Sequence, residues 1–281
     1  MTLLNTIAPS LIKDQVKLAL QEDIGQQDLT ADLTPKDEIA TATIISRENT
    51  MLCGQDWLNE VFQQLDPTIK ITWHYSDGDH VLANKTLCTL SGHARALLTG
   101  ERTAMNFIQT LSATATIAKQ YVSKIEGLAV HILDTRKTIP GLRLAQKYAV
   151  RCGGAHNHRV GLYDGILIKE NHINAAGSID LAVQQAKILH SQVAIEVEVE
   201  NFDEFEQALD AQADIILLDN FDIPALKKAV NINQGRAKLE ASGGITLQSL
   251  RAIAETGVDR ISIGALTKDI KATDLSMRFI S

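Results

Sequence analysis

The stretch Ile132–His172, ILDTRKTIPGLRLAQKYAVRCGGAHNHRVGLYDGILIKENH, concentrates cationic side chains in a chain that is acidic overall. Ten of its residues are Arg, Lys or His, whereas the whole sequence of 281 residues has 27 Lys and Arg against 34 Asp and Glu. Two short apolar runs, 130–133 and 165–168, each end on polar and charged residues, as buried strands do when they deliver side chains to a binding face. The stretch therefore predicts two strand ends beside an anion-binding pocket.

Beyond residue 127, apolar runs alternate with helical segments at a spacing of roughly 20 to 35 residues, the size of a βα unit. The runs are VHIL, GILI, VAIEVEV, DIILL, AKLEA and RISIG. Such a chain forms either a barrel or a doubly wound parallel sheet. No GxGxxG follows a run, which removes the best signal for a dinucleotide-binding sheet, so we expect an α/β barrel. Six runs are too few for a closed eight-stranded barrel.

The first part of the chain has a different pattern. Residues 40–92 contain short segments separated by turn residues, which predicts an antiparallel sheet, and residues 94–125 predict a long helix that joins two domains. We therefore expect an α/β protein with a smaller N-terminal domain at 1–112 and a barrel domain at 113–267. The tail 268–281 is expected to be able to rejoin the first domain.

Composition excludes several classes of protein. The formal charge of −7 argues against a general nucleic-acid binder, which needs a basic face. The three cysteines, Cys53, Cys88 and Cys152, form no CxxC pair, so neither a disulfide framework nor a zinc knuckle is indicated. No segment predicts export or a membrane span. We expect a cytoplasmic protein that binds neither nucleic acid nor membrane.

Glycines follow the last two predicted strands, in ASGGI at 241–245 and SIGAL at 262–266. Glycine lets backbone N–H groups approach phosphate oxygens, and barrels commonly hold phosphate at this position. The pattern predicts a ligand with a phosphate group. The alternative is that Gly243, Gly244 and Gly264 only permit tight turns.

Carboxylates mark two further strand ends. Glu196, Glu198 and Glu200 alternate with valines and share one face of a strand, and the later members are expected nearer the open end of the barrel. Asp219 directly follows the next apolar run. Glu198 and Asp219 together suit Mg²⁺, which takes one or two carboxylates with waters and ligand phosphates. Alternatively, they are structural partners of the nearby cations.

Four cations, Arg136, Lys137, Arg159 and Lys169, are expected to converge on one pocket and to require a ligand with several anionic groups. From its position, Lys169 can be a phosphate ligand, an ion-pair partner or a Schiff-base nucleophile. Other cations are interpreted as solvated. His156 is expected in a loop, and Arg143, Lys147 and Arg151 are expected on one exposed helix face.

Six segments in order resemble the quinolinate phosphoribosyltransferase family. They are ERTAMNFIQTLS, LDTRKTIPGLR, KYAVRCGGAHNHRVGLYDGILIKENH, EVEVEN, LLDNF and ASGGI. The resemblance covers most of the chain, and TRKTxPGLR followed by NHR and IKENH is its most specific part. One small departure is Ala155 followed by His156, where glycines are common before NHR. The resemblance implies an N-terminal α/β domain, an open α/β barrel of about seven parallel strands, and a homodimer whose sites borrow residues from the neighbouring subunit.

The resemblance also implies roles for individual residues. The quinolinate carboxylates would be held by Arg136, His158, Arg159 and, from the partner subunit, Arg102. Lys137 and Lys169 would lie between quinolinate and phosphoribosyl pyrophosphate, and Glu198 and Asp219 would bind the ribose and Mg²⁺. The 5′-phosphate would be bound by Ser242, Gly243, Gly244 and Gly264. Among these residues, the resemblance implies catalytic roles for Lys137, Lys169, Glu198 and Asp219.

The implied activity is phosphoribosyl transfer to quinolinate with decarboxylation, a reaction of NAD biosynthesis. Several alternatives stay open from the sequence. One is a Schiff-base aldolase that uses Lys169, because it shares the barrel and the phosphate loops. Others are a related transferase that takes nicotinate without decarboxylation, a paralogue with another substrate, and a catalytically silent barrel that senses a phosphorylated metabolite.

Overall fold

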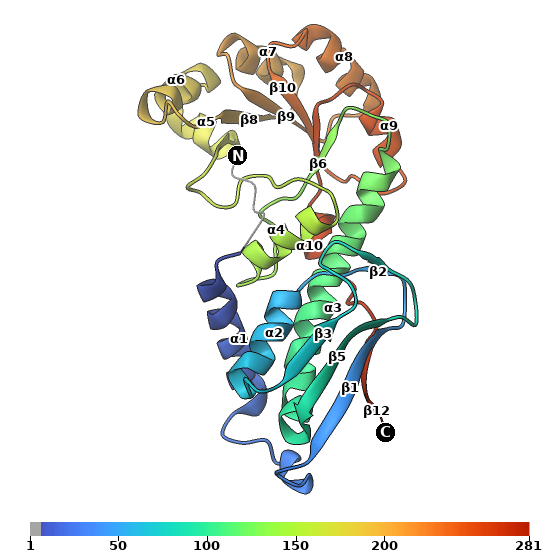
Figure 1. The fold of residues 1–281 in the computed structure, drawn as a ribbon. Helices are drawn as coiled ribbons and strands as arrows, with labels where there is room; N and C mark the ends of the chain where they lie inside the picture. The colour runs from blue at the N-terminus through green and yellow to red at the C-terminus, as the bar shows by residue number, and fades with distance from the viewer. Residues whose placement is uncertain (1–6, 281) are drawn as a thin grey trace. The chain divides into compact units, whose positions relative to one another are not determined.

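Residues 7–280 are described in the computed structural model, and they divide into two compact units (Figure 1). The barrel unit contains residues 120–138 and 155–266. The sheet unit contains residues 7–119, 139–154 and 267–280. This division assigns 139–154 to the sheet unit, whereas the sequence pattern placed that segment in a barrel domain at 113–267.

Six parallel strands form the barrel unit, and each predicted apolar run coincides with one of them to within two residues at its carboxyl end. They are β6 (His131–Leu133), β7 (Ile166–Ile168), β8 (Ile195–Val199), β9 (Ile215–Asp219), β10 (Lys238–Ser242) and β11 (Arg260–Ser262). Their order in the sheet is β6-β11-β10-β9-β8-β7. All pairs are parallel, so the carboxyl ends of the strands meet at one edge, where a binding site is expected. The predicted α/β fold is confirmed.

The sheet is open between β6 and β7, its two outer strands. A single parallel bridge between Leu133 and His156 lies where a seventh strand would pair with β6. There His156 N–H donates to Ile132 O at 2.8 Å, and Asp134 N–H donates to His156 O at 3.1 Å. The segment around His156, GGAHNHR, has no apolar run to extend this bridge. In residues 7–280, the expected seventh strand is therefore reduced to one residue.

Helices cover the outside of the parallel strands (Figure 1). They are α5 (Glu170–Ala176), α6 (Ile179–Leu189), α7 (Phe202–Asp210), α8 (Ile223–Asn233) and α9 (Leu250–Ala254). The short α10 (Ala265–Lys268) follows β11 and is divided between the two units after residue 266. Polar side chains begin three of these helices by accepting a backbone N–H: Ser178 for α6, Asn201 for α7 and Asp222 for α8. These caps fix where the chain turns away from the binding edge of the sheet.

The sheet unit is built on an antiparallel sheet of order β12-β1-β5-β3. Its strands are β1 (Ile39–Ser46), β3 (Lys70–Trp73), β5 (Thr86–His93) and β12 (Leu275–Ile280), so the C-terminal segment pairs with β1. A small ladder joins β2 (Thr50–Met51) to β4 (His80–Val81). The helical elements are α1 (Pro9–Ile24), α2 (Gln55–Leu65), the 3₁₀ turn Ala31–Leu33, and α3 (Ala94–Lys124), which continues into the barrel unit after residue 119.

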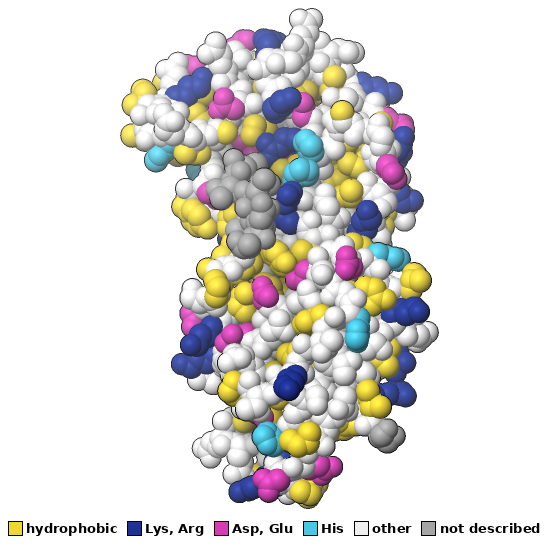
Figure 2. All heavy atoms as spheres, in the orientation of Figure 1, with side chains coloured by type: hydrophobic (Ala, Val, Ile, Leu, Met, Phe, Trp, Pro, Cys, Tyr) yellow, Lys and Arg dark blue, Asp and Glu magenta, His cyan; other side chains and the backbone are white. Residues whose placement is uncertain are grey.

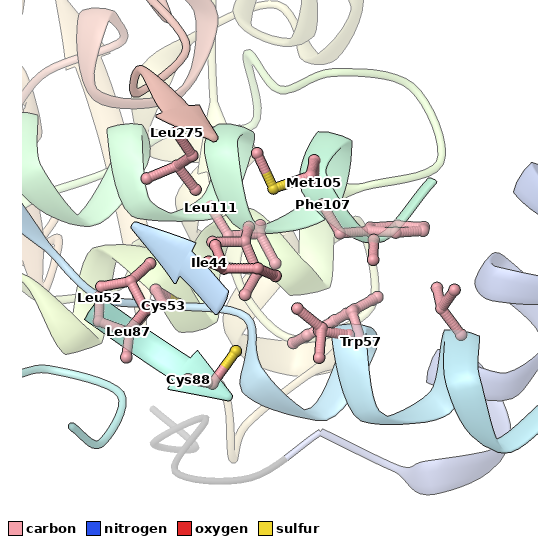
Figure 3. Packing of buried hydrophobic residues seen from close by; sticks show 14 of the residues in the cluster. Ile44, Leu52, Cys53, Trp57, Leu87, Cys88, Met105, Phe107, Leu111 and Leu275 are labelled. Atoms are coloured by element: carbon pink, nitrogen blue, oxygen red, sulfur yellow. The ribbon is translucent and has the colours of Figure 1, made fainter. Parts of the chain in front are cut away.

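The core of the sheet unit lies between this sheet and the helices (Figure 3). Ile44 of β1 and Cys88 of β5 are opposite each other in the register and are fully buried. Trp57 of α2 and Leu111 of α3 cover them from the helical side. Apolar residues at helical spacing on α2 and at alternate positions on the strands therefore form one hydrophobic core.

Helix α4 (Arg143–Cys152) is part of the sheet unit because its buried face belongs to that core. Gln146 is fully buried, accepts from Ile139 N–H at 2.8 Å and donates to Thr267 O at 2.8 Å. Lys147 is also fully buried. The expectation of a solvated cationic helix face was therefore wrong for Lys147, because the sequence period did not reveal which neighbours the helix has.

Surface charge is mixed. Lys and Arg side chains are interspersed with acidic and apolar ones on the face shown in Figure 2. This face has no continuous basic stripe of the kind that binding to a phosphate backbone requires. In the described part of the chain, no helix is long and apolar enough to cross a bilayer.

Candidate active site

A pocket of about 250 Å³ lies at the carboxyl ends of the barrel strands. Eight of its lining residues were predicted from the sequence: Arg136, Lys137, His158, Arg159, Lys169, Glu198, Asp219 and Ser242. The other four, Thr135, Leu167, Leu217 and Ser262, were not. The structure thus brings the predicted cations and carboxylates to one place.

Asp134 holds the NHR segment against the end of β6. Its side chain is fully buried and accepts from Asn157 Nδ2 at 2.7 Å and from His158 N–H at 2.8 Å. A buried carboxylate is costly unless it is hydrogen-bonded, and these donors satisfy both of its oxygens. Asp134 therefore fixes the positions of His158 and Arg159 relative to Arg136.

Arg159 and Arg136 lie close enough to repel each other. Burial and the charge of Arg136 both lower the pKa of Arg159. Arg159 Nη1 donates to Gly165 O at 3.2 Å, and a side chain at Gly165 would meet Arg159 Cβ at 3.0 Å. Two adjacent guanidinium groups favour an anion between them, because Arg forks bind carboxylates bidentately. This arrangement suits a ligand with carboxylate groups.

Lys169 and Glu198 form an ion pair across two neighbouring strands. Lys169 follows β7, Glu198 is in β8, and Nζ lies 2.5 Å from Oε2. The side chain of Lys169 is 40% exposed and that of Glu198 is 14% exposed. The pair is therefore at the mouth of the pocket, where Lys169 is both an ion-pair partner and accessible to a ligand.

Asp219 ends β9 beside Ser242, which ends β10, and the two residues are paired in the parallel register. Asn220 N–H donates to Ser242 O at 3.0 Å, and Asn220 Nδ2 donates to an Asp219 carboxylate oxygen at 2.8 Å. Gly243 has φ +100°, and a Cβ there would lie 2.1 Å from Asn220 Oδ1. The glycine is required both by its backbone conformation and by this close approach.

A buried charge cluster lies behind the pocket in the barrel interior. His158 Nε2 lies 3.0 Å from Glu196 Oε2 and 3.4 Å from Glu240 Oε1, and Arg260 Nε lies 3.0 Å from Glu240 Oε2. Glu240 is completely buried, and Glu196 is 3% exposed. His158 and Arg260 therefore face two almost fully buried carboxylates, whose charges would be unstable without partners.

The charges in this cluster shift one another's pKa values. Burial lowers the pKa of His158, but the bonds to Glu196 and Glu240 outweigh it and raise the value to about 9. One contact opposes that rise, because Arg159 N–H points at His158 Nδ1 from 2.7 Å, which favours an unprotonated Nδ1 and a proton on Nε2. Burial and the charge of Glu240 raise the pKa of Glu196. In every case, Nε2–H donates toward the glutamates and fixes the ring at the pocket floor.

Some predicted residues do not line this pocket. Gly243 and Gly244 directly follow Ser242, and Gly264 lies two residues beyond β11. Arg102 is exposed on α3 in the sheet unit. His156, expected to be a solvated loop residue, is half-buried, bridges to β6 and packs edge-on against His131 with ring centroids 4.4 Å apart. Glu200 lies beyond the end of β8 and is exposed, which leaves Glu198 as the glutamate of the pocket.

The sequence pattern did not reveal Glu196, Glu240 and Arg260 as a cluster with His158. Glu240 and Arg260 each lie in a predicted apolar run, AKLEA and RISIG, and a charged residue inside a buried strand was the available signal. Their pairing depends on the parallel register of β10 with β11, in which Glu240 is opposite Arg260.

Comparison with known proteins gives matches along nearly the whole chain. The model of the quinolinate phosphoribosyl transferase N-terminal domain matches residues 28–112, and that of the C-terminal domain matches residues 114–278. A probable nicotinate-nucleotide pyrophosphorylase (carboxylating) of Bacillus subtilis is 42% identical over 257 residues, which cover 91% of this chain and 89% of that protein. A mitochondrial quinolinate phosphoribosyltransferase (decarboxylating) 2b of Nicotiana tabacum is 37% identical over 291 residues, which cover 95% and 82%.

Solved structures agree. The nicotinate-nucleotide pyrophosphorylase from Francisella tularensis superposes with a TM-score of 0.97 at 51% identity and covers 100% of both chains. A Streptococcus pyogenes structure titled NadC gives a TM-score of 0.94 at 34% identity, with coverage of 98% and 99%. The two family domains match in the order of the chain, and the relatives align over almost its full length. This chain therefore belongs to the quinolinate phosphoribosyltransferase family.

Proposed function

We propose that this chain is a pentosyltransferase that transfers the phosphoribosyl group of phosphoribosyl pyrophosphate to quinolinate. The products are nicotinate mononucleotide, pyrophosphate and CO₂, in a reaction of NAD biosynthesis. Family membership supports the reaction. The observation that carries it is the convergence of four cations and two carboxylates on one pocket, because both substrates bear several negative charges.

Arg136, His158 and Arg159 would bind the two carboxylates of quinolinate. The mutual repulsion of the two arginines is relieved when an anion lies between them. His158 has a fixed position in the pocket wall, because Asp134 holds its backbone and Glu196 accepts from its ring Nε2. Such preorganisation lets the pocket bind a rigid dicarboxylate ring in one orientation.

Lys137 and Lys169 would lie between the pyridine ring and the phosphoribosyl donor. Both line the pocket. Lys137 is exposed, whereas Lys169 forms an ion pair with Glu198. A lysine acts as a point charge on phosphate oxygens, so the pair would neutralise charge on the donor as it approaches the ring. The ion pair of Lys169 argues against the aldolase alternative, because a Schiff base requires a free amine.

Glu198 and Asp219 would bind the ribose and Mg²⁺. They lie at the ends of neighbouring strands, line the same pocket and offer oxygen donors, which fit a hard divalent cation. Mg²⁺, when bound, supplies positive charge that stabilises the departing pyrophosphate. The residues Ser242, Gly243, Gly244 and Gly264 would bind the 5′-phosphate through backbone N–H groups and the serine hydroxyl.

In the transfer step, the lone pair of the pyridine nitrogen forms a bond to C1′ of the ribose as the C1′–O bond to pyrophosphate breaks and its electrons leave with that group. The side chains of Glu198 and Asp219 stabilise positive charge that develops on the ribose. The C2–carboxylate bond then breaks, CO₂ leaves, and the electron pair stays at C2 beside the cationic nitrogen. A proton completes C2. No covalent intermediate with the chain is required.

We further propose a homodimer in which Arg102 reaches the pocket of the partner subunit. Its exposure on α3 and its position outside the barrel unit are compatible with that role. A cytoplasmic location stays a prediction, supported by three cysteines that are all unpaired.

An assay with quinolinate, phosphoribosyl pyrophosphate and Mg²⁺ tests the proposal. We expect CO₂ and nicotinate mononucleotide in equal amounts, with loss of turnover in Arg136→Ala and with EDTA. Turnover of nicotinate without CO₂ release would instead identify a non-decarboxylating transferase. Tight binding of both compounds without turnover would identify a sensor, and trapping of an adduct on Lys169 by borohydride would identify an aldolase.

A further inference from the structure

Two thiols and a carboxylate from three distant segments meet in the sheet unit. Cys53 follows β2, Asp77 lies in the turn between β3 and β4, and Cys152 ends α4. Their sulfur and oxygen atoms all lie within 4.8 Å of one another. The phosphoribosyl site does not use them, since all the residues that line its pocket belong to the barrel unit.

Asp77 is held in place by neighbours on both of its oxygens. Oδ1 accepts from Gly54 N–H at 3.0 Å and from Gln55 N–H at 3.2 Å, and Oδ2 accepts from Tyr148 Oη–H at 3.1 Å. Gln55 Oε1 in turn accepts from Asp77 N–H at 2.9 Å. The carboxylate therefore has one orientation, and its Oδ2 side is shared only with a hydroxyl that can rotate.

Each of the three groups can lose a proton and then bind a cation through sulfur or oxygen. Burial raises the pKa of the Cys53 thiol, with Cys152 and Asp77 adding to the effect. Burial also raises the pKa of Asp77. The pKa of Cys152 is lowered, chiefly by its hydrogen bond with Cys53 and also by the charge of Arg151. Metal ligands bind in their deprotonated form, so a divalent cation that enters the cluster displaces these protons from the sulfur and oxygen atoms.

We propose that Cys53, Cys152 and Asp77 form a binding site for a thiophilic divalent cation such as Zn²⁺. Two thiolates and one carboxylate are donors that tetrahedral Zn²⁺ accepts, with a water or the Tyr148 hydroxyl as the fourth ligand. Zn–S bonds of about 2.3 Å place two sulfurs about 3.8 Å apart in a tetrahedron, within the observed limit. Binding releases the thiol protons to solvent, and Arg151 offsets part of the remaining negative charge.

Access to the site and the origin of its ligands are consistent with this role. Cys53 is fully buried, whereas Cys152 and Asp77 are partly exposed, so an ion can enter from their side. Ligands drawn from positions 53, 77 and 152 have no short spacing, which is why no zinc motif is visible in the sequence. A bound ion would join the β2–α2 connection, the β3–β4 turn and the end of α4.

Cobalt(II) titration of the reduced, metal-free full-length protein tests the site. Thiolate coordination gives a sulfur-to-cobalt charge-transfer band that oxygen ligands such as Glu198 and Asp219 do not produce. We expect this band to saturate at one equivalent of Co²⁺ per chain and to disappear on addition of one equivalent of Zn²⁺. A parallel thermal scan should show a rise in the unfolding midpoint with Zn²⁺, because the ion binds only the folded chain.

Variants assign the ligands. Cys152→Ser should abolish the band, and Asp77→Asn should weaken Zn²⁺ affinity by at least about tenfold. Cys88→Ala is the matched control, since Cys88 is a buried free thiol of the same unit outside the cluster and alanine places no hydroxyl in the core; it should bind as the wild type does. Cys53→Ser is less useful, because that site is fully buried and the variant can fail to fold.

Absence of a charge-transfer band in the reduced wild-type protein would overturn the proposal, as would an unchanged band in Cys152→Ser. Mass analysis that finds Cys53 and Cys152 joined as a disulfide, with no metal affinity after reduction, would identify the pair as a redox couple instead.

Discussion

Lys169 Nζ lies 2.5 Å from Glu198 Oε2, so the cation that follows β7 and the carboxylate near the end of β8 are held together at the pocket mouth. Removing the lysine takes a positive charge from the pocket and also frees Glu198. We expect Lys169→Ala to lower kcat/KM by at least about 100-fold, because charge placed for the transition state is lost. Steady-state kinetics with both substrates measure the effect.

Lys238→Ala is the control for this variant. Lys238 pairs with Asp259 at 2.7 Å, also within the barrel unit, but it begins β10 and is therefore at the opposite edge of the sheet. Its kinetics should match those of the wild type. Equal losses in the two variants would show that ion pairs in the barrel act on the fold rather than on the reaction.

Glu240 is completely buried and faces Arg260 and His158. It lies 3.0 Å from Arg260 Nε and 3.4 Å from His158 Nε2. Glu240→Gln removes the carboxylate that pairs with Arg260 and leaves His158 with Glu196 alone, so we expect the free energy of unfolding to fall by about 3 kcal/mol in urea titrations. The exposed i,i+4 pair Arg251–Glu255 provides the comparison, and Glu255→Gln should cost less than about 0.5 kcal/mol. Similar losses in both would contradict the buried-pair account.

Gly243 has no room for a side chain beside Asn220. Gly243→Ala should raise KM for phosphoribosyl pyrophosphate about tenfold or more and change KM for quinolinate less, because the displaced loop is the proposed phosphate site. Gly235→Ala tests strain alone, since Gly235 has φ +79° with nothing within 4 Å of a new Cβ. It should cost about 1 kcal/mol of stability without a change in either KM. An equal change in both KM values for Gly243→Ala would argue against a phosphate-specific role.

The sequence predicted where strands end better than it predicted which side chains of distant segments contact each other. Arg136, Lys169 and Asp219 were placed at the pocket because each lies within three residues of the end of an apolar run, and parallel strands bring such ends to one edge. The six runs also led to the barrel. Residues of the pocket that sit inside a run, such as Leu167 and Leu217, gave no signal that separates them from core residues.

The errors arose where packing between distant segments decides the outcome. Lys147 has the spacing of an exposed cation, yet α4 buries it in the sheet unit. The links of His158 to Glu196 and Glu240 were not predicted, because they depend on how β8, β10 and the NHR segment are arranged around the barrel. Helical period and alternation describe one element at a time, so they cannot supply these contacts.

Shared sites in a dimer can be tested by mixing two inactive variants. Arg102→Ala and Lys169→Ala should each be inactive, whereas refolded mixtures should recover up to about a quarter of wild-type activity. In a mixed dimer, one site carries both lesions and the other carries none, if Arg102 belongs to the partner subunit's site. A mixture that stays inactive while mixed dimers form would show that Arg102 acts within its own subunit or not at all.

The free energy of unfolding at acidic pH should depend on the charge of Asp66. Hydrogen bonds from Thr68 and His93 lower the pKa of Asp66 from 3.8 to about 2 in the folded chain. A depressed folded-state value means that the carboxylate stabilises the fold fully above pH 3.8 and that this stability is lost as the pH falls toward 2. The difference in unfolding free energy between the wild type and Asp66→Asn should therefore shrink between pH 5 and pH 3 in urea titrations. Thr68→Ala removes the largest cause of the shift and should show part of the same loss, whereas a difference that stays constant over this range would mean that Asp66 acts through packing rather than through its charge.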